Sequence, residues 1–455
     1  MMYTLDTIAA VATPPGFGGI GIIRISGEKA AALGAKLFNP KRKVAFSPGR
    51  MYFGDFTDSK GKHIDTGLFV WFKSPRSFTG EDVVEFHCHG GIVILQTMLR
   101  AIFDLGVRLA EPGEFSKRAF LNGRIDLAQA ESISDLISAS SNKAAEIARS
   151  HYRGRLSAAI EAIRDKVISV LAWIEAEIDY PEAELDLPGR DKAAATLEQQ
   201  ITVLEGLQST YQEGKIYRDG VVTVILGSPN VGKSSLLNIL AGEERAIVTD
   251  IPGTTRDVLE VPVTIRGIPL RLADTAGIRE SGDVIEKIGI ERARKLAEQA
   301  DLILLILDTS RPLTEEDDLL LQNVSRDNAI VVLNKTDLPA VIDAGEIAAR
   351  GFQHITEISA LQEQGIEALK DEIENLFISG KFSPDTTFIS NQRHYQALVT
   401  AAGLLRQVAA NWETLPSDLL ALDLRQAWQA LGEITGAVWT DDLLDSIFQR
   451  FCLGK

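Results

Sequence analysis

The residues best suited to chemistry form a glycine-rich run from Gly227 to Ser234, with the sequence G-S-P-N-V-G-K-S. Backbone N–H groups of such a run wrap around phosphate oxygens, Lys233 can reach the β- and γ-phosphates, and the Ser234 hydroxyl can ligate Mg²⁺. The apolar stretch Val221 to Leu226 precedes the run and the helix-compatible segment Ser235 to Ala241 follows it, which would aim a helix N-terminus at the anion. This arrangement predicts a nucleoside triphosphate site.

Guanine is the predicted base. The tetrapeptide Asn334-Lys335-Thr336-Asp337 closes a second apolar, strand-like run, Ala329 to Leu333. The Asp337 carboxylate can accept hydrogen bonds from both N1–H and the 2-amino group of guanine, an arrangement that adenine does not offer. Ser359 and Ala360, after another apolar run, would form a companion loop near the guanine O6.

Two further segments lie between the phosphate loop and the base-reading residues. Asp274-Thr275-Ala276-Gly277 ends a predicted strand, where Asp274 would hold Mg²⁺ through water and the Gly277 N–H would sense the γ-phosphate. Thr254-Thr255-Arg256-Asp257 would supply a second Mg²⁺-linked hydroxyl. The five motifs follow the order of guanine-nucleotide switch domains and predict a GTPase over residues 216–377.

The residue that orients the attacking water is not evident from these motifs. Ile278 stands where many relatives of this fold carry a glutamine, and an isoleucine can neither donate nor accept a hydrogen bond. Glu286 could orient water with its carboxylate, and Asn230 could hold a monovalent cation beside the phosphates. Arg256 and Arg279 are rival candidates for an arginine finger. The plainer alternatives are a helix-opening acid for Glu286 and a self-capping loop residue for Asn230.

Composition limits what the rest of the chain can be. Its 455 residues suggest about three domains, and 45% hydrophobic with 24% charged residues is ordinary globular usage. A net charge of −16 argues against a generally basic nucleic-acid-binding surface, so RNA contacts would need local patches or a partner protein. The candidate patches, each with solvated surface charge as its alternative, are Lys41-Arg42-Lys43, Lys117-Arg118, and Arg149, Arg153 and Arg155.

The chain carries no sign of export or of a membrane anchor. The first ten residues contain no basic residue, and the longest apolar run, Leu302 to Leu307, is far too short to span a bilayer. Only Cys88 and Cys452 are present. A cytoplasmic location is therefore expected.

The segments on either side of the GTPase differ in character. Residues 1–118 consist of β-branched runs interrupted by glycines, as in Gly16 to Gly21, and predict an α+β domain. Apolar residues then recur with helical spacing in residues 119–215, with one long helix ended by Tyr180-Pro181, and again in residues 378–455. We therefore expect an α/β P-loop GTPase domain inserted into an all-α helical bundle, although the apolar stripes also fit a coiled-coil seam between chains.

Two cysteine-containing segments permit more than one interpretation. Cys452 lies fourth from the end, but Gly454 and Lys455 suit a prenylation signal badly, which leaves a reactive thiol or a plain packed cysteine. In His87-Cys88-His89, strand alternation points both histidines the same way and supplies only two obvious ligands. Packing is therefore favoured over metal binding for the two histidines.

The whole chain resembles the tRNA-modification GTPase MnmE (TrmE) family. The GTPase motifs contribute to this resemblance, and four further groups of residues carry it: Ala12-Thr13-Pro14-Pro15-Gly16 with the G-I-I-R-I-S-G run ending at Gly27, Ser77-Phe78-Thr79-Gly80-Glu81-Asp82, Pro112-Gly113-Glu114-Phe115-Ser116, and the terminal Cys452-Leu453-Gly454-Lys455. The resemblance implies a homodimer that acts with the FAD-dependent partner MnmG (GidA), in a heterotetramer or larger complex. Together they would place an aminomethyl or carboxymethylaminomethyl group on carbon 5 of the wobble uridine of certain tRNAs.

The same resemblance implies the ligands and their residues. The one-carbon donor would be 5-formyl- or methylene-tetrahydrofolate, bound by an N-terminal domain that also mediates dimerisation, and Cys452 would be functionally required. Glu286 would orient the attacking water, Ser234 and Thr255 would hold Mg²⁺, and K⁺ would activate hydrolysis. The folate site would comprise Arg24, Glu85, Arg124 and Lys455, and the K⁺ site Asn230, Thr249, Ile251 and Thr254. The GTP-binding residues would be Asn230, Val231, Gly232, Lys233, Ser234, Ser235, Thr249, Asp250, Ile251, Pro252, Gly253, Thr254, Thr255, Asp274, Thr275, Ala276, Gly277, Asn334, Lys335, Thr336, Asp337, Ser359, Ala360 and Leu361.

Two other classes of function remain open from the sequence. One is a switch GTPase that assists ribosome assembly and modifies nothing. The other is a folate enzyme that its GTPase domain merely regulates.

Overall fold

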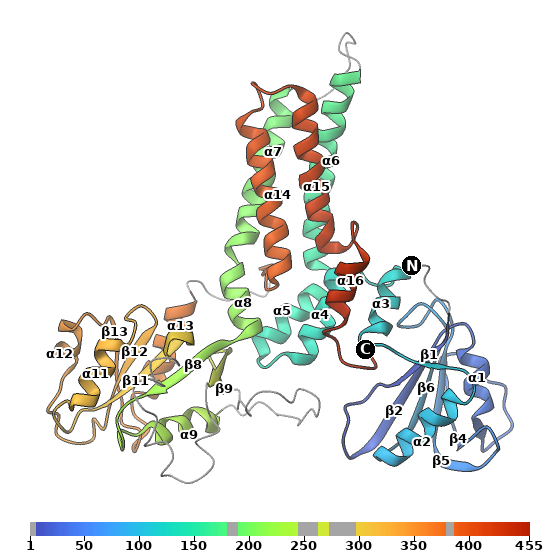
Figure 1. The fold of residues 1–455 in the computed structure, drawn as a ribbon, viewed down its shortest axis with the longest axis horizontal. Coiled ribbons are helices and arrows are strands. Elements are labelled where there is room, and N and C mark those ends of the chain that lie inside the picture. Colours follow the sequence, from blue (N-terminus) through green and yellow to red (C-terminus); the bar gives the residue numbers. More distant parts are fainter. Residues whose placement is uncertain (1–5, 180–189, 244–262, 273–296, 379–385) are drawn as a thin grey trace.

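The computed structural model describes residues 6–179, 190–243, 263–272, 297–378 and 386–455. Long helices stand upright as a bundle, with one β-sheet domain on each side of its base (Figure 1). The N-terminal domain lies on one side, and the domain that contains the glycine-rich run lies on the other. No helix within the described ranges is long and apolar enough to cross a membrane.

The N-terminal domain is built on a seven-stranded sheet with the order β3-β4-β5-β6-β2-β1-β7. Neighbouring strands are antiparallel except for the parallel pair β1 and β7. The strands are β1 (Ile8–Val11), β2 (Gly18–Ser26), β3 (Phe38–Pro40), β4 (Met51–Thr57), β5 (His63–Phe72), β6 (Val83–Gly90) and β7 (Arg108–Leu109). Helices α1 (Ala30–Lys36) and α2 (Ile92–Phe103) pack on the sheet.

Alternation along the strands separates the two faces of this sheet. Ile23, Ile25 and Phe86 belong to the main apolar core, together with residues of α2. Ile8 and Ala10 of β1 instead join a smaller cluster with Phe115 of α3 (Glu114–Leu121). The second face is therefore left for polar side chains around Phe115.

The glycine run at the start of β2 differs from its prediction. The sequence predicted that the glycines from Gly16 to Gly21 interrupt the strands, yet Gly18–Ser26 forms one strand, with a shift in register between Gly18 and Gly21. A Cβ atom at Gly21 would lie 2.8 Å from the Leu95 side chain and 3.1 Å from the Gly90 Cα. The glycine is thus needed for close approach of the backbones inside a strand.

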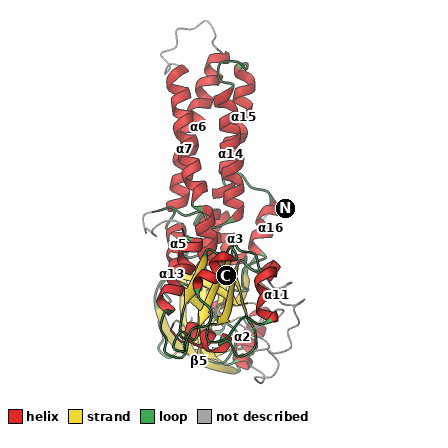
Figure 2. Ribbon diagram, turned by 90° about the vertical axis from the view of Figure 1, so that its left-hand side faces the viewer, coloured by secondary structure: helices red, strands yellow, loops and turns green. Residues whose placement is uncertain are grey.

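Four long helices, α6 (Arg155–Asp179), α7 (Arg190–Ser209), α14 (Gln392–Ala410) and α15 (Ser417–Thr435), run side by side in the bundle (Figure 2). One continuous apolar core, which includes Leu156, Leu204, Leu405 and Leu431, joins them. The apolar stripes seen in the sequence therefore cover one another within a single chain. Shorter helices at the base and the C-terminal end are α4 (Leu127–Ser138), α5 (Asn142–Tyr152), α8 (Tyr211–Asp219) and α16 (Asp441–Phe448).

The third domain is an α/β layer structure whose sheet has the order β13-β12-β11-β8-β10-β9. All neighbours are parallel except β9 and β10, which form a hairpin. The strands are β8 (Val221–Leu226), β9 (Val263–Ile265), β10 (Ile268–Leu272), β11 (Leu302–Asp308), β12 (Ala329–Asn334) and β13 (His354–Glu357), and the helices are α9 (Lys233–Glu243), α11 (Glu315–Asn323), α12 (Ala344–Ala349) and α13 (Ile366–Phe377). Separate apolar cores cover its two faces, which explains why β11 is apolar from Leu302 to Leu307, before Asp308 ends it.

The chain enters this domain after α8 and returns to the bundle at α14. Polar contacts fix both crossings to α4 and α5. Arg218 pairs with Asp135 at 2.9 Å on the way in, and the His151 ring bonds the Phe388 carbonyl at 2.7 Å on the way out. The predicted fold, an α/β domain inserted into a helical bundle behind an α+β domain, is confirmed.

Candidate functional site

The glycine-rich run forms a loop between β8 and α9 that ordinary side chains could not adopt throughout. Gly227, Asn230 and Gly232 have φ angles of 148°, 62° and 103°. A Cβ atom at Gly227 would collide with the Ile306 carbonyl, and one at Gly232 would collide with the Asn334 side-chain amide. The loop therefore requires glycine at both positions and a residue that tolerates the left-handed region at Asn230.

Lys233 opens α9 and folds back over the loop. Its ammonium group donates to the carbonyls of Gly227 at 2.7 Å and Ser228 at 2.8 Å. Ser234 and Ser235 in the same helical turn are exposed. The Lys233 ammonium group and the exposed hydroxyls of Ser234 and Ser235 thus lie at the N-terminus of α9. This arrangement is the one that binds phosphates with Mg²⁺.

The base-reading residues meet this loop at the carboxyl ends of the strands. The Asn334 side chain, at the end of β12, donates to the Val231 carbonyl at 2.7 Å and accepts from the Ala360 N–H at 2.9 Å. Asn334 is 2% exposed, so it joins the phosphate loop to the second base loop from inside the protein. The Asp337 carboxylate accepts from the Ser359 hydroxyl at 2.5 Å, which brings the two predicted guanine contacts together. Leu361 beside them is 84% exposed.

Other predicted GTP-site residues lie outside the described ranges. They are Thr249, Asp250, Ile251, Pro252, Gly253, Thr254, Thr255, Asp274, Thr275, Ala276, Gly277 and Glu286, as well as the rival arginines Arg256 and Arg279. Their roles stay predictions.

The structure also reveals supporting residues that the motifs did not indicate. Asp308 at the end of β11 accepts from the Lys335 ammonium at 2.6 Å, and this contact lowers the pKa of Asp308 against the opposing effect of burial. Asp317 in the first turn of α11 accepts from the Ser228 hydroxyl at 2.5 Å. An acidic residue that closes an apolar strand was the only sequence signal for Asp308, and nothing local pointed to Asp317.

A second polar cluster lies on the N-terminal sheet. Arg24 of β2 and Glu85 of β6 are directly opposite in the register, and both Arg24 Nε and Nη2 lie 2.9 Å from Glu85 Oε1. The rings of Phe78 and Phe115 each have their centroid 5.6 Å from the Arg24 guanidinium. The pKa of Glu85 is lowered because hydrogen bonds from His87 and Arg24 and the Arg24 charge outweigh the effect of burial. The carboxylate is therefore ionised and partly buried.

The C-terminus of the chain reaches this cluster. The Phe115 N–H donates to the Lys455 carbonyl at 3.1 Å, and Gly454, with φ of 90°, packs against Val11 where no Cβ would fit. Burial lowers the pKa of the Lys455 ammonium, and the Arg24 charge lowers it further. The charge of Glu85 acts in the opposite direction and favours the ammonium form of Lys455.

Two remaining residues predicted for this region sit at its edge. Cys452 is exposed, whereas Cys88 is buried and its pKa is raised to about 11 by burial. Arg124 packs its aliphatic carbons against Gly80, two residues from Phe78. No contact of Arg124 with Arg24 or Glu85 is found among the described residues.

One predicted basic patch is structural instead. Arg118 is only 1% exposed and pairs with Asp6, Glu81 and Glu114. Lys117 pairs with Asp445 at 2.6 Å. Because these cations hold α3 to its surroundings, Lys117-Arg118 is not a free patch for RNA.

The histidines of β6 bind carboxylates. His87 contacts Glu85 at 3.3 Å and His89 contacts Asp65 at 2.8 Å. Within the described residues, no three histidine, cysteine or acidic side chains gather as a metal site would require.

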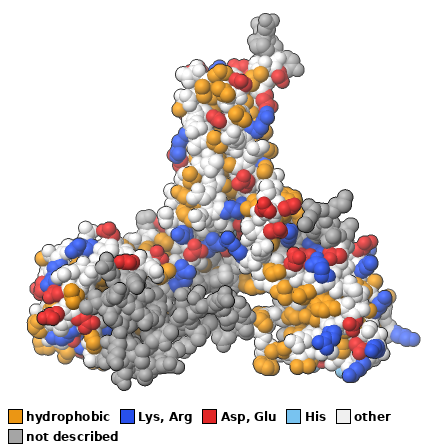
Figure 3. All heavy atoms as spheres, in the orientation of Figure 1, with side chains coloured by type: hydrophobic (Ala, Val, Ile, Leu, Met, Phe, Trp, Pro, Cys, Tyr) orange, Lys and Arg blue, Asp and Glu red, His pale blue; other side chains and the backbone are white. Residues whose placement is uncertain are grey.

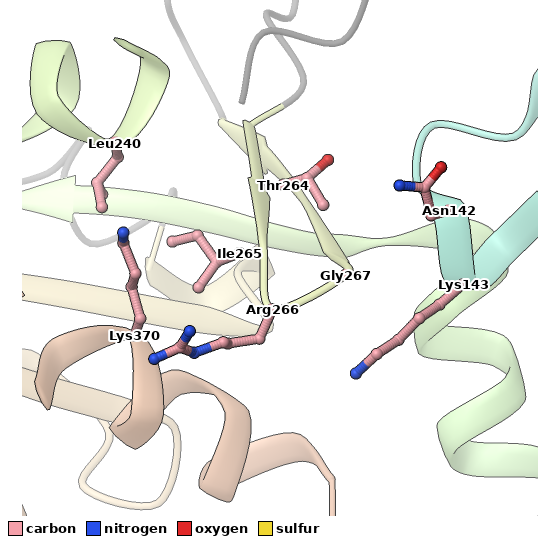
Figure 4. Close-up of a pocket in the computed structure, with 8 residues that line it drawn as sticks. All are labelled: Asn142, Lys143, Leu240, Thr264, Ile265, Arg266, Gly267 and Lys370. Atoms are coloured by element: carbon pink, nitrogen blue, oxygen red, sulfur yellow. The ribbon is translucent and has the colours of Figure 1, made fainter. Parts of the chain in front are cut away.

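A cavity of about 460 Å³ lies where the β9–β10 hairpin meets α5, and it is lined by Lys143, Arg266 and Lys370 (Figure 4). Each of these cations already pairs with a carboxylate. Their partners are Glu374 for Lys143, Asp371 and Glu367 for Arg266, and Glu367 for Lys370. The cavity is therefore an ion-paired junction between two domains rather than an anion site.

The phosphate loop before α9 and the guanine-type loops after β12 and β13 define a P-loop GTPase. Two family models match the chain: "MnmE helical domain" over residues 127–452 and "GTP-binding protein TrmE N-terminus" over residues 7–124. The tRNA modification GTPases MnmE of Geobacillus kaustophilus (strain HTA426) and Clostridioides difficile (strain 630) are 47% and 45% identical to it, each with 100% of both chains covered. The chain therefore belongs to the MnmE family of tRNA modification GTPases.

Among solved structures, Era of Aquifex aeolicus bound to GDP and AlF4⁻ is 28% identical. The similarity covers 41% of this chain and 66% of that one, with a TM-score of 0.24.

Proposed function

We propose that this chain is a potassium-activated GTPase that, with the FAD-dependent partner MnmG, adds a (carboxymethyl)aminomethyl group to carbon 5 of the wobble uridine of certain tRNAs. The observation that carries the proposal is that the C-terminal segment reaches the Arg24–Glu85 cluster: the Lys455 carbonyl accepts from the Phe115 N–H, and the Phe115 ring lies 5.6 Å from the Arg24 guanidinium. A GTPase that only binds and releases a partner has no need for a second polar site of this kind.

The Arg24–Glu85 cluster suits a folate as the one-carbon donor. A pterin ring presents adjacent N–H groups, and an ionised carboxylate such as Glu85 can accept hydrogen bonds from them. The flat face of the pterin suits aromatic neighbours such as Phe78 and Phe115. The glutamate tail of a folate is anionic and would be attracted by Lys455 and Arg124. When bound, the folate would supply the one-carbon unit, while these residues hold and orient it. Cys452, exposed beside Lys455, is the reactive group that this chain offers there.

The GTPase centre would bind Mg²⁺-GTP through Lys233 and Ser234, with Thr255 as a second Mg²⁺ ligand and Asp274 acting through water. Potassium would lie between Asn230 and the segment that contains Thr249, Ile251 and Thr254, when the GTPase domains of the two copies in the dimer pair with each other. It would place positive charge where other GTPases use an arginine. Glu286 would orient the attacking water.

We also propose that the chain is a homodimer formed through its N-terminal domain. Hydrophobic side chains gather on the visible surface of this domain (Figure 3). Exposed fractions reach 93% for Phe17, 66% for Ile20, 58% for Phe53 and 75% for Val93. A surface of this kind is typical of an interface between proteins.

Nucleoside analysis tests the proposal. A strain that lacks this gene is complemented with the wild-type chain or with Glu85→Gln, and its tRNA is digested and analysed by mass spectrometry. Wild type should restore the modified wobble uridine. Glu85→Gln should not, although its GTP hydrolysis should stay near the wild-type rate, because Glu85 lies in another domain. An unaltered wobble uridine in the deletion strain would instead favour a ribosome-assembly switch.

A further inference from the structure

We propose that His87 is a positioning residue for the folate site: its imidazole holds the second oxygen of the Glu85 carboxylate, so that this oxygen faces the bound pterin in one orientation. The inference rests on the folate site proposed above. His87 belongs to none of the GTPase motifs, and it is not one of the residues expected to bind folate.

The sheet places the two side chains together. Glu85 and His87 are alternate residues of β6, so both project from the same face. On the neighbouring strand β2, Glu85 is opposite Arg24 and His87 is opposite Ile22. His87 Nε2 lies 3.3 Å from Glu85 Oε2, and the two side chains are 20% and 15% exposed. The contact therefore follows from side-chain alternation along one strand, and it is largely shielded from water.

The two oxygens of the Glu85 carboxylate have different hydrogen-bond partners. Oε1 accepts a hydrogen bond from Arg24 Nε at 2.9 Å, and Arg24 Nη2 forms an ion pair with the same oxygen at 2.9 Å. Among the residues that the structure describes, His87 is the one hydrogen-bond partner of Oε2, so this oxygen can accept a further hydrogen bond from an incoming N–H. The oxygen that would meet the ligand is thus the one that His87 holds.

Without His87 this oxygen would be less well placed. Arg24 anchors only Oε1, and the carboxylate could turn about that contact. A side chain that becomes ordered only when the ligand binds loses conformational entropy at that step, and this loss lowers the affinity for the ligand. A side chain that is already held in its binding orientation does not incur this loss. Among the described residues, the charged group that contacts His87 is Glu85, which is itself paired with Arg24 on β2. Its partners in the strand register are Ile22 on β2 and Leu68 on β5, both apolar.

The test measures binding of 5-formyltetrahydrofolate to the full-length protein by titration calorimetry. His87→Phe, which keeps a ring but removes the hydrogen bond, should raise Kd about tenfold, equivalent to about 1.4 kcal/mol. His87→Gln can donate from nearly the same point and should recover most of the affinity. The matched control is His89→Phe on the same strand, which loses a contact with Asp65 instead and should bind as wild type does.

The outcomes separate the role of His87 from the folate site itself. Unchanged GTP hydrolysis and thermal midpoint in all variants would show that they fold. If Glu85→Gln binds poorly while His87→Phe binds like wild type, or if His87→Gln is as weak as His87→Phe, the positioning role is overturned and the folate site stands. If the wild-type protein binds no folate, the proposed folate site fails and the role of His87 with it.

Discussion

At the scale of single residues, the GTP site and the proposed folate site each depend on side chains that join separate segments of the chain. Asn334 holds the phosphate loop and the second base loop, and Arg24 with Glu85 joins two strands of the other sheet. The spacing of sequence motifs could predict Lys233, Asn334 and Asp337, because phosphate and guanine demand those residue types in that order. It could not predict the contact of Asp308 with Lys335, because these residues close neighbouring strands whose register a single sequence leaves open.

Base selection is testable at Asp337. Replacing it with Asn puts an N–H₂ donor where guanine presents N–H groups, and xanthine, with a carbonyl at carbon 2, becomes the better match. Asp337→Asn should weaken GTP binding by about a hundredfold, as expected for losing hydrogen bonds to a charged group, and strengthen XTP binding. Fluorescence titration with both nucleotides measures this.

Ser359→Ala is the control for that experiment. It removes the hydroxyl that donates to Asp337 but keeps the carboxylate. It should weaken binding modestly and keep the preference for guanine. If Asp337→Asn also kept that preference, the base assignment would be wrong.

Glu286 has a role confined to the transition state in the proposed mechanism. Glu286→Ala should therefore lower kcat by about 10²- to 10⁴-fold, the usual range for a general base or water-orienting group. The affinity for a non-hydrolysable GTP analogue should change little. Single-turnover hydrolysis together with nucleotide titration distinguishes this result from a large loss of affinity, which would mean that Glu286 binds the substrate.

At the scale of elements, periodicity and end signals predicted the long helices well. The long helix predicted before Tyr180-Pro181 is α6, which is described as far as Asp179, and its predicted end lies outside the described residues. Gly436 caps α15 with φ of 76°. The start of β2 was not predicted, because glycines usually break strands. Here Gly21 lies within the strand, since Gly90 and Leu95 are too close to leave room for a larger residue. The buried Glu131, Arg393 and His394 contacts between α4 and α14 were also not predicted, because they join residues about 260 positions apart.

The junction between α5 and the returning chain predicts a pH effect on stability. Burial, and then the charge of His394, lowers the pKa of His151 to about 4. The unfolded chain takes up this proton at a higher pH than the folded chain, since an exposed histidine has a pKa of about 6.5. The free energy of unfolding should therefore fall by roughly 3 kcal/mol as the pH drops from about 6.5 to about 4.

His151→Gln isolates this contribution. Its side chain can still donate to the Phe388 carbonyl but does not titrate. Chemical denaturation from pH 7 to pH 4 should show a smaller loss of stability in the variant than in wild type. Glu131, whose pKa is lowered to about 2 because His394 and Arg393 outweigh burial, acts in a lower window, from about 4.5 downward. Identical pH profiles for wild type and His151→Gln would contradict the assignment.

At the scale of the whole molecule, the two ends of the chain meet at one domain. Lys455 and Gly454 pack on the N-terminal sheet, and Gly113 lies against Phe448 of α16. The GTPase domain is inserted between the helices that make this return possible. Residue patterns predicted the insertion, but only family resemblance suggested that Lys455 serves the N-terminal site, because no local pattern encodes a contact across the full length of the chain.

Potassium-dependent pairing of two GTPase domains is the step that would make hydrolysis fast in a protein with isoleucine at position 278. Initial rates of GTP hydrolysis by the full-length protein, in KCl and in NaCl at equal ionic strength, test it most directly. We expect rates about a hundredfold higher in potassium, the usual effect of one well-placed electrostatic contact in the transition state. We also expect the excess to fall as the protein is diluted below its dimerisation range. Equal rates in the two salts, or full activity of a monomer in sodium, would contradict the proposed mechanism.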